Sequence, residues 1–380
     1  MTGAYDVEDY RQLARRRLPK MVFDYLEGGA DDETGLVHNR AAIDRIRMAP
    51  RRLVDVGQRD LTTTLFGRTS SMPVAIAPTG LNGIIWPGGD IVLAQAAAKA
   101  GIPFLLSTAS NCSIEEVARK SDGDRWFQLY VVQRDLARDL TERAKHNGYS
   151  TLVLTTDVVV NGNRKRDLRN TFGVPVRYTP RTLLDGILHP RWSLQLVRNG
   201  VPELANFVSA KATSVDAQAA LLSRKMDATF DWDALAELRD LWPGTLVVKG
   251  LARPDDVQRC AALGVDGVVL SNHGGRQLDG AAAPIETLAQ TRATTSLPLL
   301  IDSGYRSGEH VVKALCSGAN MVLLGRATLY GLAARGPAGV DEVLAIIRAE
   351  IDRTLALIGC PSVNQLSSDF LYTNHQEALR

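Results

Sequence analysis

The chain has few cysteines, almost no excess of charge of one sign and no long uninterrupted apolar run. Its four cysteines are far apart and form no CxxC pair, which excludes a disulfide scaffold and a zinc ribbon. We expect no metal site, and we expect these residues to be reduced thiols of a cytosolic protein. They are Cys112, Cys260, Cys316 and Cys360.

The balance of charge also excludes one class of partner. Lys and Arg number 44 and Asp and Glu 42, so the formal net charge is only +2. A nucleic-acid-binding domain usually carries a strong basic excess, and we therefore expect no nucleic-acid partner. Hydrophobic residues make up 45% of the 380, which is enough for a sizeable core and excludes a wholly disordered chain.

The longest charge-free segment, residues 69–89, has the length of a bilayer span. Pro73, Pro78 and Pro87 interrupt it, together with four glycines. Prolines at such spacing are poorly compatible with a spanning helix. A buried strand followed by an active-site loop explains the segment better.

Short apolar segments rich in β-branched residues recur along the chain, and helix-compatible segments separate most of them. Each apolar segment has the length of a strand that is buried on both faces. Eight strands alternating with helices predict an α/β fold of the (β/α)8 TIM-barrel type, with a doubly wound open sheet as the alternative. The expected strands are Val74–Ala77, Pro103–Leu106, Trp126–Val131, Thr151–Thr155, Thr245–Val248, Gly267–Leu270, Pro298–Ile301 and Asn320–Leu324.

Capping residues mark several of the expected helices. Ser113, with Glu116 three residues later, predicts a helix start, and glycines such as Gly148 predict helix ends. The helices expected around the barrel are Ile91–Ala100, Ile114–Lys120, Leu136–Asn147, Asp255–Leu263, Glu309–Ser317 and Val340–Ile358.

We predict a single domain over residues 1–380. An N-terminal helical segment (1–65), with helices over Val7–Leu13 and from Pro19 to Gly28, would precede the barrel (66–169 and 234–359). Residues 170–233 form an insertion after the fourth strand that is far longer than a normal connection of this kind. We expect it to be a lid or a binding element.

Every expected strand ends in, or is followed by, a short segment with residues that can form hydrogen bonds or carry charge. In a barrel, active sites lie at the C-terminal ends of the strands, so these residues predict a site there rather than a set of solvated loop tips. They are Pro78, Thr79 and Gly80; Ser107; Gln128 and Tyr130; Thr156 and Asp157; Lys249; Ser271 and His273; Asp302, Ser303, Gly304 and Arg306; and Gly325 and Arg326.

The loops after the seventh and eighth strands place glycines beside Arg306 and Arg326. This is the usual phosphate-binding position of the fold, because glycine lets backbone N–H groups approach and arginine donates two parallel hydrogen bonds. The chain has no Walker loop and no GxGxxG opening a helix after a strand. A nucleoside triphosphate or a dinucleotide is therefore disfavoured.

The most specific segment is SNHGGRQLD, residues 271–279. It places His273 three residues before Arg276, so a proton acceptor and an anion-binding group can share one pocket. Imidazole, with an ordinary pKa of about 6.5, suits a general base near neutrality. A carboxylate such as Asp157 would hold the ring and stabilise the imidazolium. The other histidines are assigned structural roles: His38, His146, His189, His310 and His375.

SNHGGRQLD resembles the characteristic motif of the FMN-dependent α-hydroxy-acid oxidising enzymes. Further segments match in the same order over nearly the whole chain, and the chain is therefore identified as a member of that family. The greatest resemblance is to members that oxidise (S)-mandelate, in residues 18–30, 52–56, 78–83, 106–111 and 324–336. The matching segments are Tyr25–Ala30, Gln128–Tyr130, Thr155–Asp157, Lys249–Gly250, Asp302–Gly304 and Leu323–Arg326.

The resemblance implies FMN as the cofactor and a role for each matching residue. His273 would be the base, hydrogen-bonded to Asp157, and Tyr130 would bind the substrate hydroxyl. Lys249 would lie against the N1–O2 edge of the flavin, where a cation stabilises reduced FMN. The substrate carboxylate would be held by Arg276, Arg164 and Tyr25. The other FMN-binding residues would be Pro78, Thr79, Gly80, Ser107, Gln128, Thr156, Ser271, Asp302, Ser303, Gly304, Arg306, Gly325 and Arg326.

Two departures from related enzymes bear on substrate and acceptor. Ala109 stands where glycolate oxidase has a tryptophan, which predicts room for a phenyl group unless neighbours fill the space. Gly80 stands where the short-chain oxidases have alanine, which favours a dehydrogenase. We expect oxidation of (S)-mandelate to phenylglyoxylate, with electrons passed to a membrane quinone. An oxidase acting on 4-hydroxymandelate or another 2-hydroxy acid and releasing hydrogen peroxide is the alternative; an FMN-binding isomerase and a non-catalytic membrane-surface module are further rivals.

Residues 177–211 of the insertion carry five Lys or Arg and two acids, with Tyr178, Trp192 and Phe207 among short apolar stretches. Cationic groups with aromatic anchors suit the headgroup region of an anionic leaflet. We expect peripheral attachment to the cytoplasmic side of the inner membrane, with a soluble cytoplasmic protein as the alternative. A lid or a subunit contact would also explain the segment, and the family implies a homotetramer.

Overall fold

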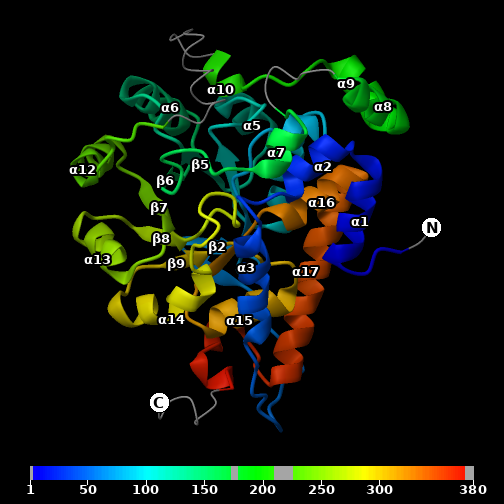
Figure 1. The fold of residues 1–380 in the computed structure, drawn as a ribbon. Coiled ribbons are helices and arrows are strands. Elements are labelled where there is room, and N and C mark those ends of the chain that lie inside the picture. The colour runs from blue at the N-terminus through cyan, green and yellow to red at the C-terminus, as the bar shows by residue number, and fades with distance from the viewer. Residues whose placement is uncertain (1–2, 173–178, 209–225, 373–380) are drawn as a thin grey trace.

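Eight parallel strands close into a barrel in a computed structural model that describes residues 3–172, 179–208 and 226–372 (Figure 1). Their order around the barrel is β10-β3-β4-β5-β6-β7-β8-β9. The (β/α)8 prediction is confirmed, and the open sheet is excluded. The strands are β3 (Val74–Ile76), β4 (Phe104–Ser107), β5 (Arg125–Leu129), β6 (Thr151–Thr155), β7 (Thr245–Leu251), β8 (Gly267–Leu270), β9 (Leu299–Ile301) and β10 (Met321–Leu324).

The barrel strands are buried on both faces, which is why they are continuous apolar runs in the sequence. Alternate residues such as Ala75, Val153 and Val247 fill the barrel interior, and the residues between them pack against the helices. A hairpin of β1 (Thr63–Leu65) and β2 (Arg68–Ser70), which was not predicted, packs its Phe66 against Trp126 at the N-terminal end of the barrel.

The expected helices are all present, with ends shifted by a few residues. They are α1 (Val7–Arg17), α2 (Lys20–Glu27), α4 (Gly89–Ala100), α5 (Ile114–Lys120), α6 (Arg134–His146), α13 (Pro254–Ala262), α15 (Gly308–Cys316) and α17 (Pro337–Ile358). Eight helices of the described ranges were not predicted. Four belong to the barrel and its N-terminal segment: α3 (Thr34–Arg45), α12 (Trp232–Leu241), α14 (Pro284–Thr294) and α16 (Arg326–Arg335); the other four are α7 (Lys165–Arg169) and the three helices of the insertion. Residues 327–333 of α16 are all buried, so this helix lacks the alternation of polar and apolar faces by which helices are found in a sequence.

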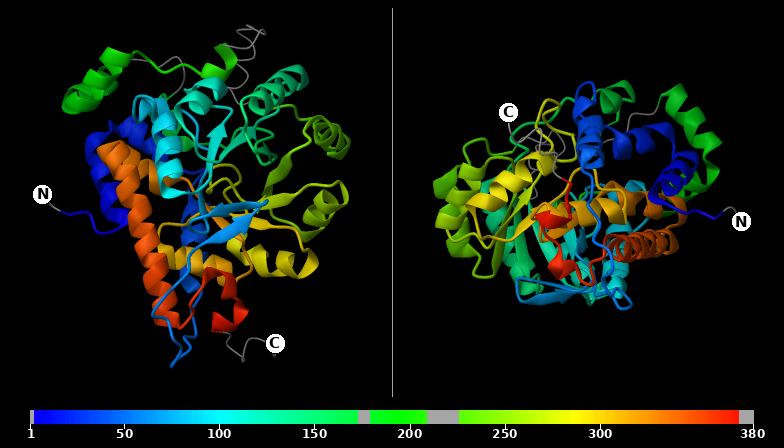
Figure 2. Two further views of the ribbon diagram at one scale, coloured as in Figure 1. Left: turned by 180° about the vertical axis from the view of Figure 1, so that it is seen from behind. Right: turned by 90° about the horizontal axis from the view of Figure 1, so that it is seen from below.

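The N-terminal segment packs along the outside of the barrel and reaches its mouth (Figures 1 and 2). Helix α1 lies against α16, and α3 lies against α14 and α15. The Asp279 carboxylate accepts hydrogen bonds from Thr34 and Gly35 at the start of α3. The Asn39 and Asn272 side chains exchange two amide hydrogen bonds of 2.9 and 2.7 Å. These contacts fasten the segment to the loop that carries His273.

The insertion contributes α8 (Pro180–Leu188) and α9 (Pro190–Asn199), which stand out from the body of the molecule (Figure 2), and the short α10 (Ala205–Val208). Among the described residues, three hydrogen bonds attach α8 and α9 to the rest of the protein: Arg17 to Gln195, the Lys20 amide to Asp185, and the Trp192 indole to the Ile84 carbonyl. The predicted Arg177, Tyr178 and Lys211 lie outside the described residues. None of the helices in the described ranges is both long and apolar enough to cross a bilayer.

The contact between α16 and α17 gives a test of the packing. A Cβ atom on Gly331 would lie 2.3 Å from the carbonyl oxygen of Gly339. We expect Gly331→Ala to lower the free energy of unfolding by about 1–3 kcal/mol, because the two helix backbones would have to move apart. Thermal unfolding monitored by circular dichroism measures the change. Gly280→Ala, at an exposed glycine whose added Cβ meets nothing within 4 Å, is the control. Equal melting temperatures for the two variants would contradict this account.

Candidate active site

A cavity opens at the C-terminal ends of the barrel strands, with an empty volume of about 1070 Å³ that includes solvent at its mouth. Most of the predicted site residues meet there, although they come from all parts of the chain. Those that line the cavity are Tyr25, Pro78, Thr79, Gly80, Ser107, Tyr130, Lys249, His273, Arg276, Asp302, Ser303, Gly304, Arg306, Gly325 and Arg326.

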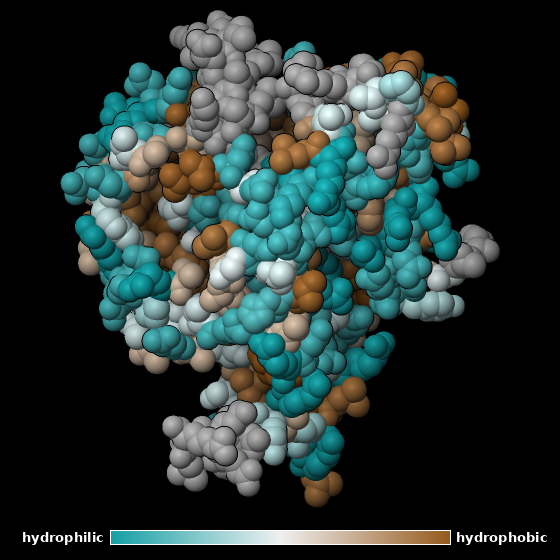
Figure 3. All heavy atoms as spheres, viewed as in Figure 1, coloured by the Kyte–Doolittle hydropathy of each residue, from teal (hydrophilic) through white to brown (hydrophobic). Residues whose placement is uncertain are grey.

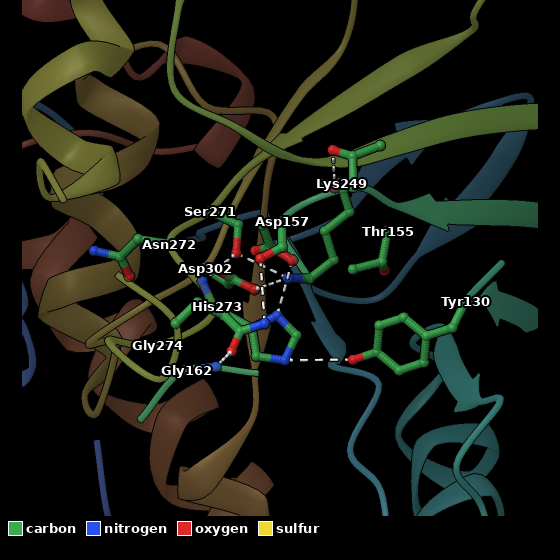
Figure 4. Close-up of polar contacts among 12 residues, drawn as sticks. Tyr130, Thr155, Asp157, Gly162, Lys249, Ser271, Asn272, His273, Gly274 and Asp302 are labelled. Carbon is green, nitrogen blue, oxygen red and sulfur yellow. Dashed lines mark hydrogen bonds and ion pairs between the residues drawn. The ribbon is translucent and has the colours of Figure 1, made fainter. Parts of the chain in front are cut away.

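The His273 imidazole lies between a carboxylate and a phenol (Figure 4). Its Nδ1 is 3.0 Å from Oδ1 of Asp157, and its Nε2 is 3.4 Å from the Tyr130 hydroxyl. Burial alone would raise the pKa of Asp157, but His273 and Lys249 outweigh it and the pKa is lowered. Because an ionised carboxylate only accepts hydrogen bonds, Nδ1 carries the proton and Nε2 is left as the acceptor on the cavity side.

The backbone that carries this imidazole is in a conformation that few residues tolerate. His273, Gly274 and Gly275 have φ angles of +58°, +66° and +72°, so three successive residues are left-handed. For a residue with a Cβ this conformation costs roughly 1–2 kcal/mol. The Ser271 hydroxyl accepts from the His273 amide at 3.0 Å, and the Ser303 hydroxyl accepts from the Gly274 amide at 2.9 Å. Backbone strain held in place in this way is typical of functional positions.

Lys249 is a buried cation beside His273. Its Nζ is 2.9 Å from the Asp302 carboxylate and donates to the Ser271 hydroxyl at 2.8 Å (Figure 4). Burial alone would lower the pKa of Lys249, but the carboxylates of Asp302 and Asp157 reverse the effect and the pKa is raised. The site therefore holds a permanent positive charge in a place that water barely reaches.

Two more cations flank the ring of Tyr25. The guanidinium carbon of Arg276 lies 5.3 Å from the ring centroid and that of Arg164 lies 5.7 Å away. Arg276 also donates to the Gly28 carbonyl at 2.6 Å, and the Tyr25 hydroxyl donates to the Gly80 carbonyl at 3.4 Å. Paired guanidinium groups beside a phenol can bind a carboxylate with a defined orientation.

Arg306 and Arg326 provide positive charge at another part of the cavity. The Arg326 guanidinium donates to the carbonyls of Leu26, Gly28 and Gly274, at 3.1, 2.9 and 2.9 Å. Burial and the nearby Arg306 lower its pKa, yet a guanidinium stays protonated at neutral pH. Within the described ranges, neither arginine forms an ion pair with a carboxylate. The pair can therefore neutralise a bound anion.

Five predicted residues do not line the cavity. Each of three contacts a residue that does line it: Asp157 contacts His273, Ser271 contacts Lys249, and the Arg164 guanidinium lies 5.7 Å from the centroid of the Tyr25 ring. The Gln128 side chain is held by Ser107 and Thr155. The Thr156 hydroxyl donates to the Lys249 carbonyl at 3.0 Å instead of entering the cavity.

Thr155 lines the cavity where Thr156 was expected. In an extended segment alternate side chains point the same way, so Thr155 shares the direction of Asp157 and Thr156 does not. That alternation was available in the sequence. Ala109, which was expected to leave room for a phenyl group, also lines the cavity. Seven further lining residues were not assigned to the site, and most of them are apolar: Leu26, Ala77, Ile85, Gly274, Tyr305, Leu323 and Leu329.

Comparison with known sequences gives consistent matches. The family described as FMN-dependent dehydrogenase matches residues 14–373. The (S)-mandelate dehydrogenase of Pseudomonas putida is 61% identical over 367 residues, which are 97% of this chain and 93% of the relative. An L-lactate dehydrogenase of Pectobacterium atrosepticum is 40% identical over 377 residues, 98% of this chain and 97% of the relative.

Solved structures agree with the sequence matches. One described as the monotopic membrane protein (S)-mandelate dehydrogenase is 60% identical, covers 98% of this chain and 100% of its own, and has a TM-score of 0.95. A mandelate oxidase variant with (S)-mandelic acid is 33% identical, with a TM-score of 0.82 over 98% of this chain and 99% of its own. The chain therefore belongs to the FMN-dependent dehydrogenase family.

Proposed function

We propose that this protein oxidises (S)-mandelate to phenylglyoxylate, using FMN. The observation that carries the proposal is the position of His273, which has Asp157 behind it and Arg276 on the same loop. A base and an anion-binding group thus face one cavity, as the oxidation of a 2-hydroxy acid requires. The 61% identity to an (S)-mandelate dehydrogenase supports the choice of substrate.

The residues of the cavity fit FMN. Arg306 and Arg326 suit its phosphate, and the buried cation of Lys249 suits the electron-rich edge of the ring. Among the described residues, the buried Thr79 hydroxyl has no hydrogen-bond partner, which is unusual unless a ligand supplies one. FMN, when bound, supplies the acceptor of the two electrons that leave the substrate.

The side chains of this protein would bind the substrate and move one proton. Arg276 and Arg164, with Tyr25, would hold the carboxylate and so place the hydroxyl near His273 and Tyr130. His273 Nε2 would take the hydroxyl proton, and ionised Asp157 would stabilise the imidazolium. The requirement for His273 is the same whether the Cα hydrogen leaves as hydride or as a proton.

Two small residues leave space in the cavity for an aromatic substrate. Gly80 and Ala109 both line the cavity, and a Cβ on Gly80 would lie 2.9 Å from that of Ala109. Both positions must therefore remain small for a phenyl group to be accommodated on this side.

The homotetramer remains an expectation from the family.

The electron acceptor is proposed to be a membrane quinone, because the insertion exposes an apolar surface. The side chains of Leu183, Ile187 and Val197 are 53%, 72% and 81% exposed, and this surface on α8 and α9 is brown at the upper right of Figure 3. Such a surface, with Arg191 and Arg198 beside it, suits insertion into an anionic leaflet. A solved relative is described as a monotopic membrane protein.

Two of the three expected aromatic anchors, Trp192 and Phe207, are not part of this surface, and Tyr178 lies outside the described residues. Trp192 and Phe207 are 9% and 2% exposed, and the Trp192 indole donates to Ile84 within the protein. Both are part of the main hydrophobic core and so join the insertion to the barrel, because a large side chain gains more by packing there than by exposure. Aliphatic side chains would contact the lipid instead.

An oxidase is the second candidate, supported by the likeness to mandelate oxidase. The two functions separate when the purified yellow protein is bleached anaerobically with (S)-mandelate and then exposed to air. Slow recolouring, with no hydrogen peroxide on the time scale of turnover, is expected. Rapid recolouring with stoichiometric peroxide would make the protein an oxidase, and no bleaching would contradict the proposed substrate.

We expect His273→Ala to keep FMN but to lower kcat by about 10²–10⁴-fold, the usual contribution of a general base. The flavin absorbance and a dye-linked assay measure the two properties. The control is His146→Ala, at an exposed histidine on α6, which should retain normal turnover. Near-normal turnover in His273→Ala would remove the base assignment.

We expect Asp157→Asn to lower kcat by on the order of 100-fold, because the neutral amide neither fixes the imidazole tautomer nor stabilises the imidazolium. Flavin content should be unchanged. Asp122→Asn, at an exposed carboxylate before β5, is the matched control. If Asp157→Asn and Asp122→Asn turn over equally fast, Asp157 has no part in catalysis.

The membrane surface is tested with Ile187→Glu and Val197→Glu combined. Each exposed aliphatic side chain inserted into lipid is worth roughly 1.5–3 kcal/mol, so the fraction bound to anionic vesicles should fall at least tenfold. Sedimentation measures binding, and the rate with a soluble dye should stay the same. Leu357→Glu on α17, 64% exposed, is the control. Unchanged sedimentation of the double variant would exclude this surface.

A further inference from the structure

The two arginines beside Tyr25 are held in different ways. Arg276 is fixed by the Gly28 carbonyl at 2.6 Å. The buried Arg164 has one polar partner in the described part of the chain: its Nε lies 3.4 Å from Oδ2 of Asp167. Its Nη1 is buried and has no hydrogen-bond partner among the described residues.

Asp167 is itself almost enclosed, with 14% of its side chain exposed. It lies three residues after Arg164, on α7 (Lys165–Arg169). Arg166 of the same helix and Arg276 of the loop after β8 face it with positive charge. Asp24 of α2 and Glu33, just before α3, face it with negative charge.

We propose that Asp167 is a positioning residue for the substrate carboxylate, because it holds Arg164 by Nε and leaves Nη1 free for the substrate. A guanidinium is planar and rigid, so fixing one end fixes the direction of the other. The unpartnered Nη1 is then the donor that the carboxylate completes. The inference rests on the proposed function, since it assigns the carboxylate of a 2-hydroxy acid to this position.

The negative charge of Asp167 affects substrate binding in the opposite direction to its orienting role. The ionised carboxylate reduces the positive potential around Arg164 and Arg276, so its removal alone would tighten anion binding. Loss of orientation weakens binding. Orientation dominates, because Arg164 would lose the one polar partner that it has among the described residues, and its guanidinium would be free to turn away from the substrate.

The first test is Asp167→Asn in the FMN-loaded enzyme. We expect KM for (S)-mandelate to rise at least tenfold, the scale of a hydrogen bond to a charged group, while kcat changes by less than about threefold. Asp32→Asn is the matched control, because Asp32 pairs with Lys165 of the same helix at 2.6 Å and is 77% exposed. An unchanged or lower KM in Asp167→Asn would overturn the proposal.

A neutral substrate separates positioning from general damage. The methyl ester of (S)-mandelate keeps the phenyl ring and the hydroxyl but has no carboxylate, so KM for the ester should be the same in wild type and Asp167→Asn. An equal loss with both substrates would mean that Asp167 is merely structural. In an Arg164→Met background the Asp167→Asn change should have almost no further effect. Additive losses would show that Asp167 acts through another residue.

The pH dependence gives an independent readout. Burial raises the pKa of Asp167 to about 6, although Arg276 and Arg166 oppose the shift. As pH falls through 6 the carboxylate gains a proton and releases Arg164, so KM of the wild type should rise. The ratio of KM in Asp167→Asn to KM in wild type should therefore fall towards one below pH 6. A ratio independent of pH would contradict the role assigned to the ionised carboxylate.

Failure of the proposed function can be recognised separately. If (S)-mandelate does not bleach the wild-type flavin, the substrate assignment is wrong. The dissociation constant of phenylacetate, measured from the perturbed flavin spectrum, then tests Asp167 by itself. A tenfold weaker complex in Asp167→Asn, with none in Asp32→Asn, supports the positioning role. Equal constants overturn it.

Discussion

Closure of the eight parallel strands is the constraint on which this site depends. Asp157 follows β6 and His273 follows β8, and 116 residues separate them in the chain. Because parallel strands in a closed barrel end at the same mouth, the carboxylate and the imidazole come within 3.0 Å without any local sequence relationship. Lys249, at the end of the intervening β7, contacts the same group of charges.

The chemistry of the mouth follows from how its charges are balanced. Lys249 stays charged because Asp302 and Asp157 oppose the cost of burial. Arg306 and Arg326 form no ion pair with a carboxylate within the described ranges, and the charges of Glu27 and Glu33 do not offset the burial of Arg326, so a bound anion would supply the missing negative charge. A buried cation that is paired needs no further partner, whereas a cation without a paired carboxylate can take an anion as its partner. Arg164 shows both situations in one side chain: its Nε is paired with Asp167, and its Nη1 has no hydrogen-bond partner among the described residues.

The sequence predicted the barrel strands well, because burial on both faces produces continuous apolar runs that are independent of distant contacts. It predicted α16 poorly, since a helix buried on all sides has no periodicity. Thr156 was predicted to line the cavity in place of Thr155, although side chains alternate in direction along an extended segment and Thr155 is the residue that lines it. The burial of Trp192 could not have been foreseen, because its partner, the Ile84 carbonyl, lies 108 residues away.

The barrel alone does not complete the site. The Gly28 carbonyl, in the N-terminal segment, accepts hydrogen bonds from both Arg276 and Arg326. One of these arginines lies at the proposed substrate carboxylate and the other at the proposed FMN phosphate. A single backbone oxygen therefore fixes the spacing between the two binding sites. Any displacement of residues 25–28 would move Tyr25 and both guanidinium groups together. This short segment therefore determines where the substrate lies relative to the cofactor.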